Sequence, residues 1–183
     1  MNGLLIRKPT QPDLQSVHHV FERTIPDAFE KEGLGFWHDF IHREIMYKKC
    51  LLNASFDLSG SDTNFLIAEA DETVIGTISF GNCGEVIKKS TESQFHSIGE
   101  LGSLYVLPLH QGQGVGSALI NAMVEHVSEQ GMEQFWLDSG YRHAQKRWLK
   151  KFGLPYKVMK NYWGPELDHM IWLCKVSDLI ESP

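Results

Sequence analysis

The alternation of apolar and polar residues predicts one short strand and two helices in the first third of the chain. Residues 4–7 are mostly apolar and are expected to form the strand. Thr10 then provides a helix cap, with an acidic residue three positions later. This first helix is expected to end at Pro26, and residues 27–35 are expected to form a loop. Helical spacing of apolar residues returns over 36–52 and predicts a second helix.

The middle of the chain carries the patterns of β-strands. Residues 65–69 and 73–80 are rich in β-formers, and the acidic turn between them predicts an antiparallel hairpin. Residues 81–97 show no clear period and are expected to form a long loop, which in a compact domain often has a functional role. Residues 98–106 are expected to form the fourth strand.

The last part of the chain combines two helices with three strands. An amphipathic helix is expected over residues 115–130, followed by a fifth strand over 134–137. The fifth strand should run parallel to the fourth, because a helix connects the two. A further helix over 142–152 and two strands, over 156–162 and 169–176, complete the chain. This order predicts an α/β protein with a mixed sheet.

A glycine-rich turn, QGQGVG over residues 111–116, joins the fourth strand to the following helix. Its glycines at 112, 114 and 116 remove Cβ atoms from the approach to the first turn of that helix. The backbone N–H groups of a first turn have no helical partner, and they carry the positive end of the helix dipole. A strand, a glycine-rich turn and a helix N-terminus in this order predict an anion site, most often for phosphate.

The two best-known glycine motifs do not explain this turn. A P-loop requires a Lys directly after its last glycine, and none is present here. The Rossmann fingerprint has the spacing G-x-G-x-x-G, whereas this turn has G-x-G-x-G. The turn also lies near the middle of the chain, and no acidic ribose ligand is evident. A different class of phosphate-containing ligand is therefore indicated.

Composition and charge narrow the function classes further. With 183 residues, a single domain over 1–183 is expected. The formal net charge of −6 argues against a general nucleic-acid binder and mildly favours a cationic partner. Three cysteines without a C-x-x-C pair indicate a reduced, cytoplasmic protein rather than a disulfide framework. No apolar run approaches the roughly 20 residues of a membrane span, so no membrane partner is expected.

Gln111, Gly114 and Gly116 resemble the acetyl-CoA-binding motif of the GNAT N-acetyltransferase superfamily, Arg/Gln-x-x-Gly-x-Gly/Ala. The preceding Leu-Tyr-Val-x-Pro is a frequent companion of that motif. The predicted order β-α-α-β-β-β-α-β-α-β-β matches the GNAT fold over essentially the whole chain. The resemblance implies an α/β fold in which the fourth and fifth strands splay apart. It also implies direct transfer of an acetyl group from acetyl-CoA to a primary amine.

The resemblance assigns the cofactor contacts as well. The backbone of Leu104, Tyr105 and Val106 would pair with the pantetheine arm and polarise the thioester carbonyl. Main-chain amides would hold the pyrophosphate, namely those of Gln111, Gly112, Gln113, Gly114, Val115, Gly116 and Ser117. Trp148 and Lys151 match aromatic and lysine positions of the family pattern and are counted among the contacts. The basic cluster over 147–151 would contact the 3′-phosphate of CoA, the alternative being a solvated helix face.

A base must remove a proton from the acceptor amine before it can attack. Glu100 is the first candidate, because several protein-acetylating family members have a glutamate at a comparable place on the fourth strand. Period two places Glu100 on the face of Gly102, Leu104 and Val106. A carboxylate near an apolar cleft has its pKa raised toward neutrality. His96 and Glu69 are alternative bases, and a surface glutamate is the alternative interpretation of Glu100.

The departing thiolate needs a proton or a hydrogen bond, which many family members supply from a tyrosine on the fourth helix. Aligning their pattern on Gly153 places Leu149 at the tyrosine position, so the usual acid is absent. Tyr141 and Tyr156 flank this helix and are the candidates to replace it. Packing is the alternative role of both.

The acceptor amine is not identified by the sequence. It is expected to contact the first two helices and the loops over 24–36 and 81–97, and it is a small molecule, a polyamine or a peptide or protein amine. A homodimer is one option for the assembly. His38 and His42 have the spacing of a zinc pair but lack a third ligand, so no metal is expected. The alternative function is a non-catalytic domain that binds or senses acyl-CoA.

Overall fold

The computed structural model describes residues 3–57, 62–92, 95 and 97–180, and its seven strands form one mixed sheet. The strand order is β1-β2-β3-β4-β5-β7-β6, and every neighbouring pair is antiparallel except β4 and β5. The mixed α/β class predicted from the sequence is confirmed. The strands are β1 (Leu5–Arg7), β2 (Asn64–Ala70), β3 (Thr73–Gly81), β4 (Glu100–Val106), β5 (Gln134–Ser139), β6 (Lys157–Met159) and β7 (His169–Lys175).

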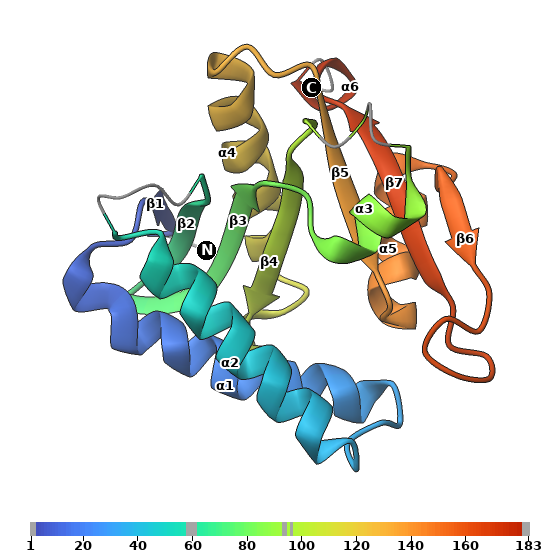
Figure 1. The fold of residues 1–183 in the computed structure, drawn as a ribbon. Coiled ribbons are helices and arrows are strands. Elements are labelled where there is room, and N and C mark those ends of the chain that lie inside the picture. The colour runs from blue at the N-terminus through green and yellow to red at the C-terminus, as the bar shows by residue number, and fades with distance from the viewer. Residues whose placement is uncertain (1–2, 58–61, 93–94, 96, 181–183) are drawn as a thin grey trace.

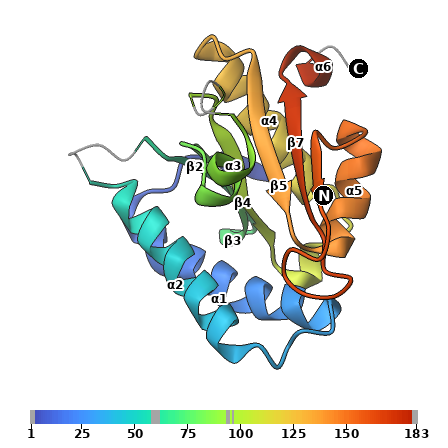
Figure 2. The same cartoon turned by 45° about the vertical axis from the view of Figure 1, so that its right-hand side comes forward.

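Helices cover both faces of the sheet (Figures 1 and 2). α1, α2 and α3 lie on one face, whereas α4 and α5 lie on the other. Short 3₁₀ turns over 11–13 and 108–110 come before α1 and α4. Within the described residues, no helix is both long and apolar enough to span a membrane. The helices are α1 (Leu14–Lys31), α2 (His38–Ala54), α3 (Glu85–Ser90), α4 (Val115–Glu129), α5 (Arg142–Phe152) and α6 (Ser177–Ile180).

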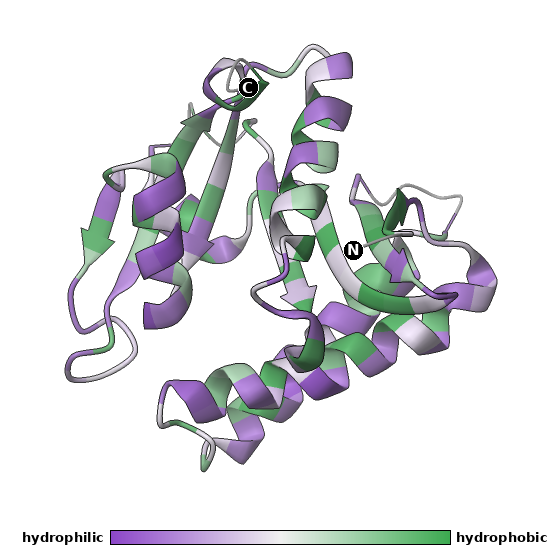
Figure 3. Cartoon of the chain, turned by 180° about the vertical axis from the view of Figure 1, so that it is seen from behind, coloured by the Kyte–Doolittle hydropathy of each residue, from purple (hydrophilic) through white to green (hydrophobic). Residues whose placement is uncertain are grey.

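The amphipathic pattern of α4 places its apolar side against the sheet. Its buried residues recur with helical spacing, as in Val115, Leu119, Met123 and Val127. Burying a side chain of this size contributes about 1.5–3 kcal/mol to stability. Seen from the α4 side, apolar and polar stretches alternate along this helix (Figure 3). The glycine-rich turn therefore precedes a helix whose position is fixed by the core.

α1 continues through Pro26, although the sequence analysis predicted that the helix would end there. Proline has no N–H, and its cost inside a helix is about 3 kcal/mol. Ile25 and Phe29, on either side of it, are buried in the apolar cluster under α1, and their burial offsets that cost. The helix runs to Lys31, so the predicted loop over 27–35 is wrong in its first part.

The second helix and the hairpin are confirmed. α2 begins and ends two residues later than predicted. β2 and β3 pair antiparallel across the acidic turn. Asp71 and Glu72 in that turn have positive φ angles of 48° and 60°. Two successive left-handed residues give a two-residue hairpin turn with the twist that antiparallel strands require.

Part of the predicted long loop over 81–97 is helical, which corrects the sequence prediction. α3 has six residues and buries only Ile87, so it is too short to show a helical period in the sequence. The C-terminal region differs in a similar way. β6 is shorter than the strand predicted over 156–162, and α6 follows β7 as an additional short helix.

A β-bulge in β4 changes which of its side chains share a face. The register between β3 and β4 slips by one residue near Ser103, which has a left-handed φ of 48°. Leu101 and Leu104 therefore both pack on the α4 side, although they are three residues apart. The expectation that Glu100 shares the face of Leu104 and Val106 is wrong. Glu100 faces the opposite side, toward the start of α3.

β4 and β5 separate after a single pair, as the predicted splay requires. Glu100 pairs with Trp136, and the Trp136 N–H donates to the Gly99 carbonyl at 2.8 Å. The strands then diverge toward their ends (Figure 1), so among the described residues no strand pairs with 101–106 on that edge. The sheet therefore consists of two halves, β1 to β4 and β5, β7 and β6.

Candidate active site

The open edge of β4 leads directly to the glycine-rich turn. Over residues 101–106, β4 pairs with β3 on one side, and on the other side it pairs with none of the strands that the structure describes. Backbone N–H and C=O groups in a protein interior need partners, because an unsatisfied one costs about 1–3 kcal/mol. An extended ligand with its own donors and acceptors can pair with such an edge as a strand would. Leu104, Tyr105 and Val106, predicted to contact the cofactor through their backbone, lie on this edge.

The three glycines of the turn have different reasons to be glycine. Gly112 and Gly114 have φ angles of +73° and +87°, which residues with a side chain rarely adopt. Gly116 has no such angle, and a Cβ there would meet only Val106 Cγ2, at 4.0 Å. The fold alone therefore does not require glycine at 116. The open space in front of it admits a ligand close to the backbone.

The first turn of α4 presents unpaired backbone donors. The Gly114 carbonyl accepts from the Ala118 N–H at 3.0 Å, which starts the helical ladder. Within the described part of the chain, no acceptor faces the amides of residues 115–117. Together with the helix dipole, these donors form an anion site. The predicted contacts in this turn are Gly112, Gln113, Gly114, Val115, Gly116 and Ser117.

The two glutamines of the turn bind the protein rather than pointing away from it. Gln111 Nε2 donates to the Val106 carbonyl at 2.8 Å, and its Oε1 accepts from Lys31 Nζ at 2.9 Å. Gln113 Nε2 donates to the Leu109 carbonyl at 2.8 Å. Their side chains therefore fix the turn between α1 and the end of β4. The backbone of the turn remains the part that can face a ligand.

Glu100, the predicted base, is partly buried where β4 and β5 separate. Its Oε2 accepts from the Gly84 N–H, at the start of α3, at 2.6 Å. Burial raises the pKa of Glu100 to about 7, and the neighbouring charge of Asp138 adds to the rise. The Gly84 bond and the charges of Lys48 and Lys88 act in the opposite direction. A carboxyl group with this pKa exchanges a proton near neutral pH, as a general base must.

Three side chains that the sequence analysis did not single out form a hydrogen-bonded chain beside Glu100. Asp138, two residues past Trp136 on β5, has its Oδ2 3.0 Å from Nε2 of the buried His169. Trp163 Nε1 donates to His169 Nδ1 at 2.9 Å. One signal was present in the sequence, an aspartate at the end of an apolar strand. Its partner lies 31 residues further on, which no local pattern reveals.

Tyr105 and Tyr141 lie on the face covered by α1 and α2. Tyr105 Oη donates to Glu44 Oε1 at 3.1 Å. Tyr141, just before α5, packs edge-on against Phe29 with a centroid distance of 5.7 Å. Burial raises the pKa of both phenols, and the negative charge of Glu44 adds to the rise. Tyr141, a predicted proton donor, therefore keeps its proton at neutral pH.

Tyr156, the other predicted proton donor, lies over β5 beside α3. Its ring packs edge-on against Trp136 at 5.2 Å and against Phe95 at 6.4 Å. Its exposed fraction is 49%. The two candidate tyrosines thus occupy different places along the opening, Tyr141 against α1 and Tyr156 against the start of β5.

The two predicted cofactor residues of α5 differ in their surroundings, because Trp148 packs against the core and Lys151 lies in the last turn of the helix. Trp148 is partly buried, joins the core on the α4 side and packs against Phe152 at 5.6 Å. Lys151 Nζ lies 6.0 Å from the Phe152 ring centroid, in the last turn of the helix. Leu149, which takes the place of the tyrosine in the family pattern, is 38% exposed. It has no proton to donate.

A buried carboxylate fastens the end of α1 to the start of α5. Glu32 Oε1 accepts from the His143 N–H at 3.0 Å and also lies 3.0 Å from His143 Nδ1. Its Oε2 accepts from Arg142 Nε at 3.0 Å. Burial alone would raise the pKa of Glu32, but these hydrogen bonds outweigh it and hold that pKa below its usual value. The contact joins the two halves of the sheet on the side of the opening.

The other candidates of the sequence analysis are not brought to this place. Glu69, an alternative base, accepts from Arg7 Nε at 2.9 Å and ties β1 to β2. His96, the second alternative, lies outside the described residues. His38 and His42 lie in the first two turns of α2. In the part of the chain that the structure describes, no three metal-ligating side chains gather.

Two of the three cysteines are buried and lack the features of a nucleophile. Burial raises the pKa of the Cys83 thiol to about 11 and that of the Cys174 thiol to about 12. Both therefore remain protonated at neutral pH, and a thiol is a far weaker nucleophile than a thiolate. Cys50 is exposed on α2. A direct reaction without a covalent enzyme intermediate agrees with this arrangement.

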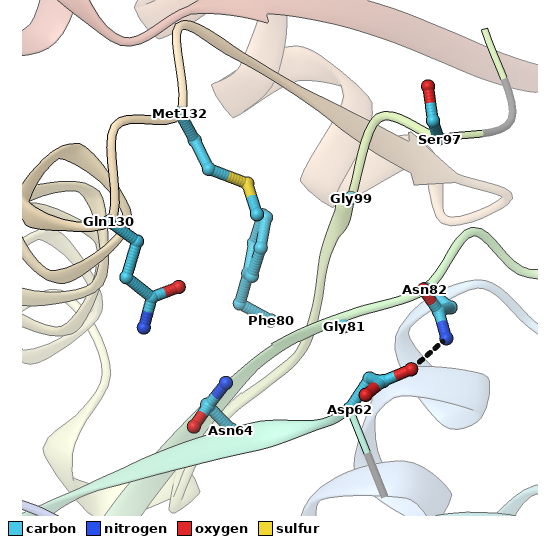
Figure 4. Close-up of a pocket in the computed structure, with 9 residues that line it drawn as sticks. All are labelled: Asp62, Asn64, Phe80, Gly81, Asn82, Ser97, Gly99, Gln130 and Met132. Carbon is cyan, nitrogen blue, oxygen red and sulfur yellow. Dashed lines mark hydrogen bonds between the residues drawn. The ribbon is translucent and has the colours of Figure 1, made fainter.

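Two pockets lie away from the open edge of β4. One, of about 430 Å³, lies between the ends of β3 and α4 (Figure 4). Phe80 and Met132 are among the residues that line it, and Asn82 Nδ2 donates to Asp62 Oδ2 at 2.9 Å. The second, of about 280 Å³, lies at the start of α2 and is lined mainly by residues 36–40. Neither contains the glycine-rich turn or Glu100.

Comparisons with known proteins concern the same elements. A model of the family described as Acetyltransferase (GNAT) family matches residues 17–154, which include β4, the glycine-rich turn and α5. A comparison with curated protein sequences finds no match.

Several solved structures share the fold over nearly the full length. A GNAT-family protein from Desulfovibrio desulfuricans is 22% identical with a TM-score of 0.71, covering 95% of this chain and 99% of that one. The PaiA N-acetyltransferase from Thermoplasma acidophilum, solved with coenzyme A, is 20% identical with a TM-score of 0.67 and coverages of 94% and 99%. The ribosomal-protein-S18-alanine N-acetyltransferase from Escherichia coli is 17% identical with a TM-score of 0.62 and coverages of 94% and 94%. At these identities the likeness concerns the fold.

Proposed function

The chain belongs to the GNAT acetyltransferase family, and on this premise we propose that it transfers the acetyl group of acetyl-CoA to a primary amine. The observation that carries the proposal is the open edge of β4, which ends at the unpaired amides of the first turn of α4. CoA combines an extended arm containing amide groups with a pyrophosphate. This order of groups fits the order of backbone partners along residues 101–117.

The residues present fit CoA by two features. The backbone of residues 104–106 would pair with the extended arm, and the amides of residues 112–117 would hold the pyrophosphate. Gly116 leaves the space that a phosphate needs near the backbone. The PaiA structure, which has this fold, was solved with coenzyme A. When bound, acetyl-CoA supplies an acetyl group activated as a thioester.

Glu100 acts as the base in the proposed reaction. Its carboxylate takes one proton from the acceptor ammonium, and the neutral amine then forms the new C–N bond while the C–S bond breaks. The second proton of the nitrogen passes to the departing thiolate, so that the products are the amide, the CoA thiol and protonated Glu100. The raised pKa of Glu100 is closer to the pKa of an amine than the pKa of an ordinary carboxyl group is. Transfer of the proton from the ammonium to Glu100 is therefore less unfavourable. The acidic side chains of Glu44 and Asp138, near the opening, favour a cationic acceptor over an anionic one.

Tyr141 is our proposed hydrogen-bond donor to the leaving thiolate. Its phenol is protonated at neutral pH, and it packs against the same apolar cluster as Tyr105 of β4. Tyr156 is more exposed and lies beside α3. Because a thiol has a pKa near 8.5, the thiolate needs only modest assistance to leave. The absence of an acid at Leu149 is therefore compatible with turnover.

The experiment that tests the proposed function has two parts. Calorimetric titration measures binding of acetyl-CoA to the purified protein, and release of free thiol is then followed with a panel of acceptors. The panel contains spermidine, a lysine peptide and a peptide with a free N-terminal alanine. We expect binding and thiol release with at least one acceptor. Absence of binding would refute the proposal, and binding with no turnover on any amine would favour a non-catalytic acyl-CoA sensor.

A further inference from the structure

We propose that Trp163 and His169 are positioning residues that hold the side chain of Asp138 in place beside Glu100, the proposed base. The inference rests on the proposed function, because it concerns the base of that reaction. It assigns a role to three residues from β5, β7 and the β6–β7 connection. None of them contacts the glycine-rich turn.

The hydrogen bonds determine which nitrogen of His169 carries the proton. The indole N–H of Trp163 can only donate, so His169 Nδ1 must accept at 2.9 Å. A neutral imidazole then has its proton on Nε2, which donates to Asp138 Oδ2 at 3.0 Å. The ring adds no positive charge to the pair. The hydrogen bond from His169 therefore fixes the position of the Asp138 side chain, and the neutral imidazole does not offset a negative charge on it.

The backbone around Trp163 and His169 is shaped for their contact. A Cβ on Gly140, directly after β5, would lie 2.7 Å from Trp163 Nε1 and 3.3 Å from His169 Nδ1. The absence of a side chain at 140 is what lets the two rings meet there. His169 is only 4% exposed. Close packing on this scale holds the imidazole in one orientation.

The register of the sheet places Asp138 beside Glu100. Glu100 pairs with Trp136, and Asp138 is two residues further along β5, on the same face as Trp136. Other groups also face this pair from each neighbouring element. They are Cys83 and Lys88 around α3, Lys48 on α2, Tyr105 on β4 and His169 on β7. Lys48 is in turn 3.5 Å from Glu44, which offsets part of its charge.

The test compares pH profiles of kcat/KM for variants of the chain. In the active wild type, the acid limb reports Glu100. Asp138→Asn removes the neighbouring charge, and His169→Phe removes the donor that holds it, so each should move the acid limb to lower pH by about one unit. In the double variant, His169→Phe should add no further shift, because His169 acts only through Asp138. Trp163→Phe leaves Nδ1 free to take up a proton, and a charged imidazole should shift the limb in the same direction.

Glu133→Gln is the matched charge control. It removes a negative charge from an exposed side chain just before β5, roughly 16 Å along the chain from Asp138, and should leave the acid limb in place. An additional shift from His169→Phe in the Asp138→Asn background, or an unshifted limb in an active His169→Phe enzyme, would overturn the inference. A lower kcat alone would indicate a merely structural role.

A second variant and a second measurement allow the inference to be tested even if the first variants fail to fold or the enzyme shows no turnover. Gly140→Ala should disturb the contact of Trp163 with His169 without changing an ionisable group, and it should also lower the acid limb. Carbon-13 NMR titration of the Glu100 carboxyl in the free protein measures the same shift without a substrate. If wild type is inactive with every amine, the proposed function fails, whereas the NMR shift still decides the present inference. An unshifted Glu100 titration in folded Gly140→Ala and Asp138→Asn would refute it.

Discussion

The role of Glu100 illustrates how a single residue was predicted for a partly wrong reason. Its position on the fourth strand and its raised pKa, now about 7, were expected. The face it occupies was not, because the bulge at Ser103 reverses the period-two pattern of β4. A bulge needs one extra residue in one strand, and the sequence has no turn signal at that point. Asp138 and His169 were missed because their contact joins two different strands and residues that are 31 positions apart in the chain.

Glu100→Gln should remove the acid limb of the pH–rate profile. At neutral pH we expect a loss of roughly 10²–10⁴-fold in kcat/KM, because the amide cannot accept the proton. The loss should narrow at high pH, where more of the acceptor amine is already neutral. Steady-state kinetics between pH 6 and 10 measure it. An unchanged profile would remove Glu100 from the role of base.

The same substitution should affect stability with a predictable sign. Glu100 has a folded-state pKa above its ordinary value of 4.5, so the folded wild type loses stability as pH rises from about 4.5 through about 7. Glu100→Gln should abolish this decline and be the more stable protein at pH 8, by on the order of 1–3 kcal/mol. Urea unfolding at pH 5 and pH 8 checks the difference. Equal slopes against pH for both proteins would contradict it.

Gly116→Ala separates helix stability from ligand binding. The space at 116 is open and its φ is not left-handed, so alanine should stabilise α4 by about 0.5–1 kcal/mol. The added methyl lies where a phosphate is proposed, so affinity for CoA should fall by about tenfold or more. Ser117→Ala, which removes a side chain but leaves the amide, is the control and should bind CoA normally. Calorimetry with CoA and thermal unfolding of the wild type and the two variants measure these effects. Unchanged affinity of Gly116→Ala for CoA would place the phosphate site elsewhere.

At the scale of elements, long amphipathic helices and the hairpin followed from the sequence, whereas short or exceptional elements did not. α4 and α5 have enough apolar positions to show their period. α3 buries a single side chain, Ile87, and carries no detectable pattern. Pro26 is a strong local stop signal, and only tertiary packing of Ile25 and Phe29 explains why α1 continues past it. Local propensity was overruled by burial in that case.

Glu32 is the residue that holds α1 against α5, so Glu32→Gln should weaken this junction. Each carboxylate oxygen of Glu32 accepts one of the hydrogen bonds from Arg142 and His143, whereas the amide of glutamine has only one accepting oxygen. We therefore expect the free energy of unfolding to fall by about 1–3 kcal/mol. Because the pKa of Glu32 is lowered on folding, its contribution is present above about pH 4.5 and is lost as pH falls below that value. Urea unfolding at pH 7 and pH 3.5 measures both effects.

Glu30→Gln is the matched control for this junction. It neutralises an exposed carboxylate two residues earlier on the same helix and should change stability little. If both variants are equally stable at pH 7, the Glu32 contacts do not support the junction between α1 and α5.

At the scale of the molecule, the sheet has two halves with one pair of residues between β4 and β5. Helix α4, the Glu32 contact and the packing of Phe29 against Tyr141 are among the further connections between the halves. The residue patterns predicted the order of the elements along the chain, and the resemblance to a known family implied the splay of the fourth and fifth strands. The contacts of Glu32 with Arg142 and His143 connect residues 110 and 111 positions apart in the chain, and no local pattern reveals such contacts.

A ligand that pairs with β4 should stabilise the whole molecule. At a CoA concentration of 100 times Kd, the expected gain is about 2.7 kcal/mol, which corresponds to a rise in Tm of roughly 5–10 °C. Hydrogen exchange should slow at residues 101–106 and 112–117 when CoA is added. Differential scanning fluorimetry and exchange mass spectrometry measure these effects. Protection that appears elsewhere but not along β4 would refute binding at the open edge.

The bulge in β4 has a consequence for aggregation. A long, straight strand edge without a partner is a template on which another chain can add a strand. β4 has such an edge inside the protein before any ligand binds, and it is most accessible while the C-terminal half of the chain is still being synthesised. The extra residue at Ser103 interrupts the regular spacing of its donors and acceptors, so a straight foreign strand cannot pair along the full edge. We therefore expect that deleting Ser103 would increase aggregation during refolding.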